Sequence, residues 1–318
     1  MAAPVPYDEF SMFRENCEEA GIPWQGEPRV ERRSFEVGPG RRLSALVWGD
    51  APPELVFLHG GGQNAHTWDT VILRLGRPAI AFDLPGHGHS DWREDRDYGP
   101  WRNAEAVAHA LDDLESNPMA SIGMSLGGLT NIRLAASRPD LVPEAVVVDV
   151  TPGVLQRAIE MTLEERGTTA LVGGPKIYDS FEEMYEKTLE LSPLRTPAAV
   201  RRGVLHNARP LEDGRWRWRY DIGGAPEGEE AGRVPEQRAF TDLWPEVARL
   251  KMPVLLVRGG LSTFVLDEHV AELRRMKPDV RVEVVDGAGH AVQSDQPNRL
   301  SELIEDFVYR GRAHREGP

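Results

Sequence analysis

The stretch Ile122-Gly123-Met124-Ser125-Leu126-Gly127-Gly128 determines how the rest of the sequence is interpreted. It contains the pattern G-x-S-x-G and lies between a short apolar run and an amphipathic run. This order predicts a strand that turns sharply into a helix at Ser125. Gly123 and Gly127 leave room for such a strained turn. The serine hydroxyl would stand clear of the sheet edge, and the N–H of Leu126 would be free at the helix N-terminus.

The composition limits the classes of function that are open to this chain. Its 318 residues, 40% of them hydrophobic, suffice for one large α/β domain with an insertion. The formal net charge of −14 argues against nucleic-acid binding, because a phosphate-binding surface needs a basic patch. A single cysteine, Cys17, excludes an internal disulfide and fits a reducing compartment, so we expect a cytoplasmic protein. The sequence shows neither a signal-peptide pattern nor an apolar run of membrane-spanning length, so we expect no membrane partner.

Strand and helix patterns alternate along most of the chain. This alternation predicts a doubly wound, mostly parallel sheet of about eight strands with helices on both faces. The predicted strands span residues 33–37, 43–48, 54–58, 79–82, 118–122, 145–150, 254–258 and 280–285. The predicted helices of this part span residues 8–20, 66–75, 103–115, 126–137, 240–250, 267–276 and 298–309.

The rhythm changes after residue 152. Three helical patterns follow one another without an intervening strand, at residues 154–165, 181–191 and 198–207, which predicts a helical insertion outside the sheet. His206 and Asn207 end the last of these helices and either face the site or lie on the surface. The predicted organisation is an N-terminal extension (1–30), a core (31–152 and 236–312), the insertion with a connecting loop (153–235) and a charged tail (313–318).

A glycine-rich turn, His59-Gly60-Gly61-Gly62-Gln63-Asn64, follows the predicted strand 54–58. Glycines at the end of a buried strand let backbone N–H groups approach a ligand closely. A phosphate cradle would need a following lysine, which is missing, whereas an oxyanion hole needs only backbone donors. We predict that the N–H groups of Gly61 and Leu126 form that hole. The neighbouring residues Gly62, Gln63 and Met124 are candidate substrate contacts.

A second turn, residues 83–92, contains two histidines and two aspartates. We do not interpret it as a metal site, because its interleaved glycines and proline indicate a tight turn without an orienting scaffold. Nothing in the sequence implies a metal or an organic cofactor, and we expect none.

Four motifs together resemble the α/β-hydrolase family in content and in order: His59-Gly60-Gly61-Gly62, Asp83-Leu84-Pro85-Gly86-His87-Gly88, Gly123-Met124-Ser125-Leu126-Gly127 and Gly287-Ala288-Gly289-His290. The resemblance covers about residues 30–310. It implies that Ser125 is a nucleophile, that His290 is its general base, and that the insertion is a helical cap. Independently of the family, a serine hydroxyl needs a neighbouring base, and that base needs a carboxylate to fix its tautomer.

The acid of this triad departs from the family pattern. The family usually carries it in a G-x-x-D turn after the seventh strand, where this sequence has Gly259-Gly260-Leu261-Ser262. We favour Asp149, at the end of the sixth predicted strand, where doubly wound folds place functional groups. Asp267 is the alternative acid, although it resembles a helix N-cap. A third possibility is that no carboxylate acts and that Ser262 orients His290.

These residues predict a serine hydrolase that cleaves a small-molecule ester, thioester, lactone or amide through an acyl-enzyme. Serine at position 125 disfavours epoxide hydrolysis and dehalogenation, which by the family's usual route need an aspartate. Two alternatives stay open: a carbon–carbon bond hydrolase, although the turn at residues 60–62 lacks the G-P-G element of that subgroup, and a non-catalytic receptor for a small ligand. The substrate's identity and the oligomeric state are not predicted.

Overall fold

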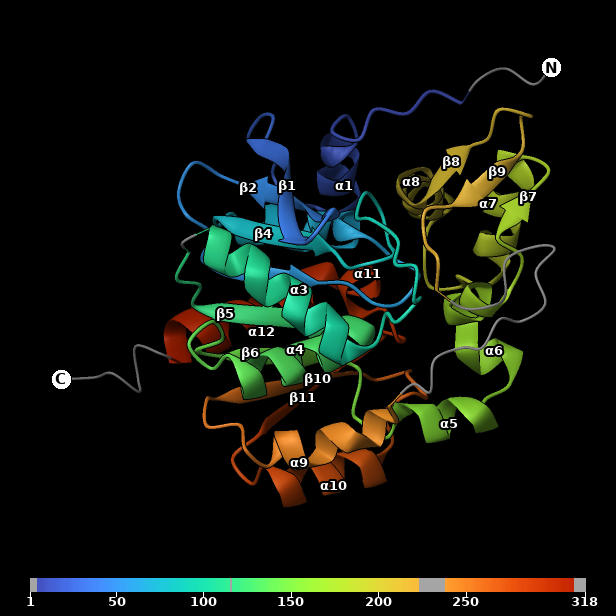
Figure 1. Ribbon diagram of the computed structural model, residues 1–318. Coiled ribbons are helices and arrows are strands. Elements are labelled where there is room, and N and C mark those ends of the chain that lie inside the picture. Colours follow the sequence, from blue (N-terminus) through green and yellow to red (C-terminus); the bar gives the residue numbers. More distant parts are fainter. Residues whose placement is uncertain (1–4, 115, 223–237, 312–318) are drawn as a thin grey trace.

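A twisted, mostly parallel sheet forms the centre of the molecule (Figure 1). The structure is a computed structural model that describes residues 5–114, 116–222 and 238–311. Within these residues the sheet has eight strands in the order β1-β2-β4-β3-β5-β6-β10-β11. β2 pairs antiparallel with β1 and β4, and the other pairs are parallel. The predicted doubly wound sheet of about eight strands is therefore confirmed. The bounds are β1 (Val30–Gly38), β2 (Arg41–Trp48), β3 (Leu55–Leu58), β4 (Ala79–Asp83), β5 (Ala120–Met124), β6 (Ala145–Val148), β10 (Val254–Gly259) and β11 (Arg281–Val285).

Helices cover both faces of this sheet, and each face has its own hydrophobic core. The central strands are buried on both sides, as their near-continuous apolar sequence requires: in β6, Val147 faces one core, and Val146 and Val148 face the other. One core is covered by α3 (Pro100–Asp113), α4 (Leu126–Ser137), α9 (Trp244–Val247) and α10 (Asp267–Met276). The other is covered by α1 (Phe13–Ala20), α2 (Asp69–Leu75), α11 (Val292–Asp295) and α12 (Pro297–Ile304).

Several predicted helices differ in extent from the observed ones: α3 begins and ends earlier than the predicted 103–115, and the predicted 240–250 is only the short α9 after a 3₁₀ turn. The N-terminal helix, predicted from residue 8, begins at Phe13 and ends where Gly21 adopts a left-handed conformation with φ 66°. The last helix, predicted as one element over 298–309, consists of α12 and a following π-helical turn, η4 (Glu305–Arg310). Short 3₁₀ turns, η1 (Ala65–Trp68) and η3 (Phe240–Leu243), precede α2 and α9.

Residues 154–222 form a separate layer beside the sheet, which we call the inserted region (Figure 1). The prediction that no strand intervenes between its helices is wrong, because β7 lies between the first two predicted helices. β7 pairs with β9, and β9 with β8, in a small antiparallel sheet. Trp216 and Trp218 of β9 are buried and alternate with arginines, which gives this strand one apolar face. The elements are α5 (Val154–Glu160), α6 (Leu163–Arg166), η2 (Gly167–Gly173), β7 (Ile177–Tyr178), α7 (Phe181–Glu190), α8 (Pro197–Asn207), β8 (Ala208–Pro210) and β9 (Trp216–Trp218).

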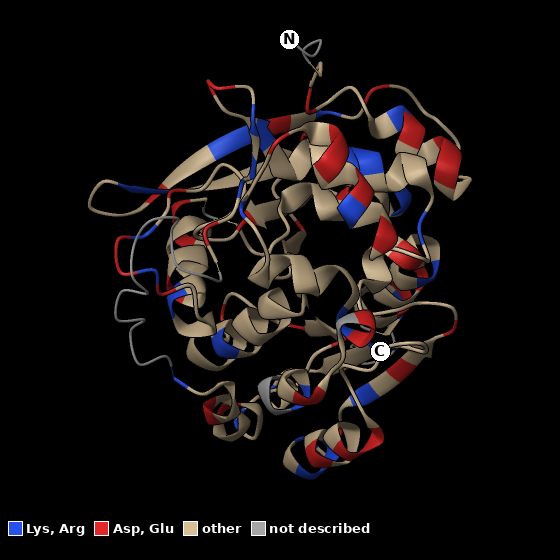
Figure 2. Cartoon of the chain, turned by 90° about the vertical axis from the view of Figure 1, so that its right-hand side faces the viewer, with Lys and Arg blue, Asp and Glu red and all other residues tan. Residues whose placement is uncertain are grey.

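The first helix predicted in this region, 154–165, is also interrupted. Thr162 caps a new helix, α6, by accepting a hydrogen bond from the N–H of Glu165, whose carboxylate accepts one from the N–H of Thr162. Most of the predicted connecting loop and the charged tail (313–318) lie outside the described residues. No helix in the described part of the chain is both long and apolar enough to cross a bilayer. Figure 2 shows acidic and basic residues interspersed over the outer helices and strands.

Candidate active site

Ser125 occupies the sharp turn that its flanking glycines predict. It lies between β5 and α4 with φ 51° and ψ −119°, a conformation that non-glycine residues rarely adopt. A Cβ atom on Gly123 would lie 2.2 Å from the carbonyl oxygen of Gly127, and one on Gly127 would lie 2.2 Å from that of Leu58. The backbone N–H of Ser125 donates to Val148 O over 3.1 Å, so the neighbouring strand β6 holds the turn.

Asp149 follows β6 directly and is fully buried. Its Oδ2 atom accepts hydrogen bonds from His290 Nδ1 over 2.7 Å and from Ser262 Oγ over 2.5 Å. Its Oδ1 atom accepts one from the backbone N–H of Gly259 over 2.9 Å. Like Ser125, Asp149 has a positive φ, here 50°. The structure thus directs three donors at one carboxylate, which satisfies the buried charge.

His290 is oriented by contacts on two sides. Its Nδ1–H points at Asp149, and its ring stacks on Phe264 with centroids 3.8 Å apart. Because Nδ1 faces an acceptor, the lone pair of the neutral ring lies on Nε2. Nε2 is buried and has no hydrogen-bond partner among the described residues. It is therefore the atom that can take a proton from a serine hydroxyl.

The other acid candidates lie in different surroundings. The side chain of Asp267 is 96% exposed and forms an ion pair with Arg258 on the surface. Ser262, at the position where the family usually has its aspartate, donates to Asp149 and accepts from the N–H of Phe264. The structure thus brings Asp149 to His290, leaves Asp267 at the surface, and connects Ser262 to His290 only through Asp149.

Among the three glycines of the glycine-rich turn, Gly61 has the backbone donor without a hydrogen bond to another described residue. The N–H of Gly60 donates to Gln63 Oε1 over 3.0 Å, and that of Gly62 donates to His87 Nε2 over 3.1 Å. In the described part of the chain the N–H of Gly61 makes no hydrogen bond. The N–H of Leu126 lies in the first turn of α4, where a helix offers it no acceptor. These two donors are the pair that the sequence predicts for the oxyanion hole.

Three further predicted site residues, Gly62, Gln63 and Met124, line the same cavity as Ser125. The N–H of Gly62 is committed to His87, and the side-chain oxygen of Gln63 is committed to Gly60, so both also shape the turn. Met124 is buried against Gly60, where a Cβ atom would lie 2.6 Å from its sulfur.

Two buried histidines, His59 within this turn and His87 in the loop of residues 83–92, form hydrogen bonds with its backbone. Burial lowers the pKa of His59 to about 4 and that of His87 to about 3, so both rings are neutral at pH 7. His59 Nδ1–H donates to Gly60 O, and His87 Nδ1–H donates to Pro85 O. His59 Nε2 accepts from the N–H of Leu84, and His87 Nε2 accepts from the N–H of Gly62. His87, in the loop of residues 83–92, thus supports the glycine turn through a hydrogen bond.

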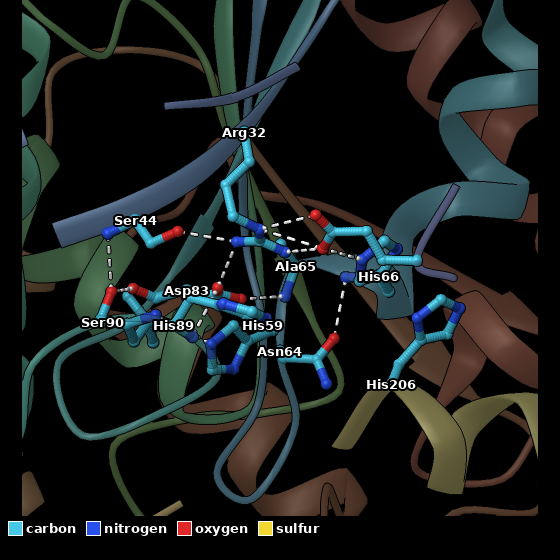
Figure 3. A network of polar contacts seen from close by, with 12 residues as sticks. Arg32, Ser44, His59, Asn64, Ala65, His66, Asp83, His89, Ser90 and His206 are labelled. Carbon is cyan, nitrogen blue, oxygen red and sulfur yellow. Dashed lines mark hydrogen bonds and ion pairs between the residues drawn. The ribbon is translucent and has the colours of Figure 1, made fainter. Parts of the chain in front are cut away.

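A polar network extends from this support to the N-terminal segment (Figure 3). Arg32 donates to Asp83 Oδ2 over 2.7 Å and to Glu9 Oε2 over 2.8 Å. Burial opposes the charge of Glu9, but hydrogen bonds from His66 and Arg32 outweigh it and lower its pKa to about 2. Burial likewise opposes the charge of His66, but Asp69 and Glu9 outweigh it and raise its pKa to about 9. The network is held together by charge-assisted hydrogen bonds.

Part of this network has the composition of a metal site. His66, Asp69 and His206 each offer one ligand atom, and these atoms lie within 4.8 Å of one another. The two imidazole rings, however, stack at 3.8 Å with an interplanar angle of 13°, so their lone pairs lie in two separate, nearly parallel planes, which disfavours their meeting at one ion. Both nitrogens of His66 already contact carboxylates. The arrangement fits a hydrogen-bonded network better than a metal centre.

A cavity of about 460 Å³ lies between the core, the inserted region and the N-terminal helix. The core supplies the wall that carries Ser125, His290 and the glycine turn. The inserted region supplies the facing wall, from η2, α8 and the chain around β9, and the N-terminal helix supplies Asn16 and Glu19. A ligand in this cavity would therefore contact three parts of the chain that lie far apart in sequence.

The fold and the site define the class of protein. The model of the Alpha/beta hydrolase family matches residues 55–303, and the chain belongs to this family. Among curated proteins it is 50% identical to esterase Rv0045c of Mycobacterium tuberculosis over 303 residues, which cover 95% of this chain and 96% of the relative. It is also 28% identical to the mouse sn-1-specific diacylglycerol lipase ABHD11, with 83% of each chain covered. A solved structure of the M. tuberculosis esterase superposes with a TM-score of 0.82 at 48% identity, covering 96% of this chain and 99% of that one.

Sequence reasoning missed contacts that join distant segments. The N–H of Gly289, next to His290, donates to Asp295 Oδ2, and Asp295 pairs with Arg195 of the inserted region. Asn207 bonds to the glycine turn, where the sequence left open whether it faces the site. No local signal could have identified the partners of Arg195 and Asn207, because these contacts span 100 and 145 residues.

Proposed function

We propose that this protein is a serine hydrolase that cleaves carboxylic esters of small molecules through an acyl-enzyme. One observation carries the proposal: His290 is held by the buried Asp149 and lines the same cavity as Ser125, while its buried Nε2 has no hydrogen-bond partner among the described residues. The 50% identity to an esterase over nearly the whole chain supports the same reaction class.

The chemistry follows from these positions. Ser125 Oγ attacks the ester carbonyl carbon while His290 Nε2 takes the hydroxyl proton, and the ionised Asp149 stabilises the imidazolium that forms. The N–H groups of Gly61 and Leu126 bind the developing oxyanion, and each such donor is worth about 3–4 kcal/mol in the transition state. The imidazolium returns its proton to the departing alkoxide. A water then repeats the sequence on the acyl-enzyme and releases the acid.

The inserted region acts in this proposal as the cap that selects the substrate. It contributes apolar and hydroxyl-bearing side chains to the cavity, among them Leu171, Val172, Val200, Thr168 and Thr169. A cavity of about 460 Å³ is within the usual size range of small-ligand pockets. The substrate would therefore be a small ester, bound in the cavity between the core and the inserted region.

The proposal is tested by labelling with a fluorophosphonate probe and by a panel of p-nitrophenyl esters of increasing acyl length. Wild-type protein should be labelled and should turn over at least one ester, and Ser125→Ala should do neither. Ser137→Ala, which removes an exposed hydroxyl at the end of α4, is the matched control and should behave like wild type. Equal labelling of Ser125→Ala would refute the nucleophile. Tight ligand binding by wild type without turnover of any ester would instead indicate a receptor.

A further inference from the structure

We propose that Asn207 is a positioning residue that holds the oxyanion-binding turn, so that ester cleavage depends on the docking of the inserted region against the core. This inference rests on the proposed serine-hydrolase function. Asn207 is the last residue of α8, and its side chain lines the cavity. Its Nδ2 donates to the carbonyl oxygen of Gly62 over 2.5 Å. The bond joins the inserted region to the residue next to the predicted oxyanion donor, Gly61.

The orientation of the Asn207 amide is fixed by its partners. The carbonyl of Gly62 can only accept, so Nδ2 must face it, and Oδ1 then faces Asn64 Nδ2 at 3.2 Å. Asn64 is oriented in turn, because its Oδ1 accepts from the backbone N–H of His66 at the start of η1. The donor and acceptor atoms of both amides are therefore assigned by their hydrogen-bond partners.

The glycine turn depends on outside contacts for its shape. Gly62 adopts φ 75°. Its N–H donates to His87 in the core, and its carbonyl oxygen accepts from Asn207 Nδ2 in the inserted region. The Gly60–Gly61 peptide, which carries the N–H of Gly61, is held at its carbonyl by His59 Nδ1–H and by the N–H of Gln63. Losing the Asn207 bond would therefore act on Gly61 through the backbone angles of Gly61 and Gly62, which glycine leaves free to change.

Asn207 is itself held firmly. Its backbone carbonyl accepts from the N–H of Arg219, next to β9, over 2.8 Å. Tyr7 of the N-terminal segment contacts the neighbouring His206 Nδ1 over 3.1 Å. Further up α8, Arg202 donates to Asn16 over 2.8 Å and forms an ion pair with Glu19. In Figure 1, α8 accordingly lies beside α1. These contacts place the amide at a defined position over the glycine turn.

The first test compares Asn207→Ala with wild type in the turnover of a short p-nitrophenyl ester. Deleting an oxyanion donor typically lowers kcat 10²- to 10³-fold, so releasing its support should lower kcat roughly 10- to 100-fold while KM changes less than about twofold. Inhibition by a trifluoromethyl ketone, whose adduct with Ser125 carries an oxyanion, should weaken in parallel with kcat/KM. Arg209→Ala, two residues further on and exposed, is the matched control and should leave all three values unchanged.

A second variant covers the case in which Asn207→Ala does not fold. In Asn207→Asp an ionised carboxylate faces the Gly62 carbonyl, whereas its protonated form can donate to that oxygen again. The ratio of its kcat to that of wild type should therefore rise at least about threefold between about pH 8 and pH 5.5. A ratio that does not change with pH overturns the proposal, as does an Asn207→Ala protein with kcat within about twofold of wild type. Failure of the underlying function is distinguishable, because wild type would then hydrolyse no ester.

Discussion

Replacing Asp149 with asparagine is expected to disable the site by forcing the wrong tautomer on His290. The Oδ1 position of Asp149 accepts from a backbone N–H, that of Gly259, which cannot rotate to become an acceptor. An asparagine must therefore keep its oxygen there and place its NH2 group at the Oδ2 position, 2.7 Å from His290 Nδ1. Nδ1 would then have to accept, and the proton of the neutral ring would move to Nε2, where it blocks proton transfer from Ser125.

The expected loss is large because the hydroxyl at position 262 cannot compensate for it. Ser262 can rotate to accept from the new NH2 group, which stabilises the unproductive arrangement. Changing the triad aspartate to asparagine through this tautomer effect lowers kcat on the order of 10⁴-fold, about 5 kcal/mol of transition-state stabilisation. Steady-state kinetics with a p-nitrophenyl ester, together with thermal unfolding to verify the fold, would measure it.

Asp267→Asn is the matched control, since it makes the same chemical change at an exposed carboxylate. It should retain activity within about twofold of wild type, because surface substitutions away from the site rarely matter. Asp149→Asn activity within tenfold of wild type would refute the reasoning. A large loss in Asp267→Asn would do the same, since the acid would then have been assigned to the wrong residue.

Three further outcomes follow from buried contacts of the structure. Ser262→Ala removes a 2.5 Å hydrogen bond to the buried Asp149 carboxylate and should lower the free energy of unfolding by about 1.5–3 kcal/mol. Urea denaturation would measure this loss, and an unchanged unfolding midpoint would contradict it. Gly127→Ala places a Cβ atom 2.2 Å from the Leu58 carbonyl oxygen and should abolish soluble expression or probe labelling, so normal labelling would be the contrary result. Stability should be highest near pH 6.5. Below that pH the unfolded chain takes up protons that native His59 and His87 do not bind until about pH 4 and pH 3, so stability falls by up to about 3 kcal/mol per pH unit. Above it, native His66 keeps its proton to about pH 9 while the unfolded chain loses it, so stability falls again. Equal melting temperatures at pH 5, 7 and 9 would contradict this last prediction.

The sequence was sufficient to predict the sheet, because the signals involved are local. It nominates Ser125 and His290 as candidate site residues from short motifs in the order of the α/β-hydrolase family. A buried strand followed by a glycine turn shows its period and its breaks within about ten residues. Asp149 could be nominated for the same reason, because a carboxylate that directly follows a central parallel strand lies at the edge where such sheets bind ligands. The structure places it 2.7 Å from His290 Nδ1.

The inserted region was harder to predict, because its elements are short and are stabilised by distant partners. β7 and β8 have two and three residues, lengths at which alternation carries no signal, and they exist because β9 pairs with both. The contact of Asn207 with Gly62 spans 145 residues. Nothing in the local sequence of an α-helix end specifies which distant carbonyl its side chain will meet, so such contacts need the folded chain.

The proposed acid, Asp149, lies close to the usual acid position of the family because two strands pair. β6 and β10 are adjacent and parallel, with Val148 beside Val257, so the residues that follow both strands can reach the same histidine. A carboxylate at both 149 and 262 would place two negative charges in one buried site, which raises the pKa of one of them and costs stability. A hydroxyl at 262 instead donates to Asp149 and helps to orient the carboxylate that His290 contacts. Serine in place of the usual aspartate is therefore part of the same arrangement as Asp149, and the two positions should change together when the acid moves from one strand to the other.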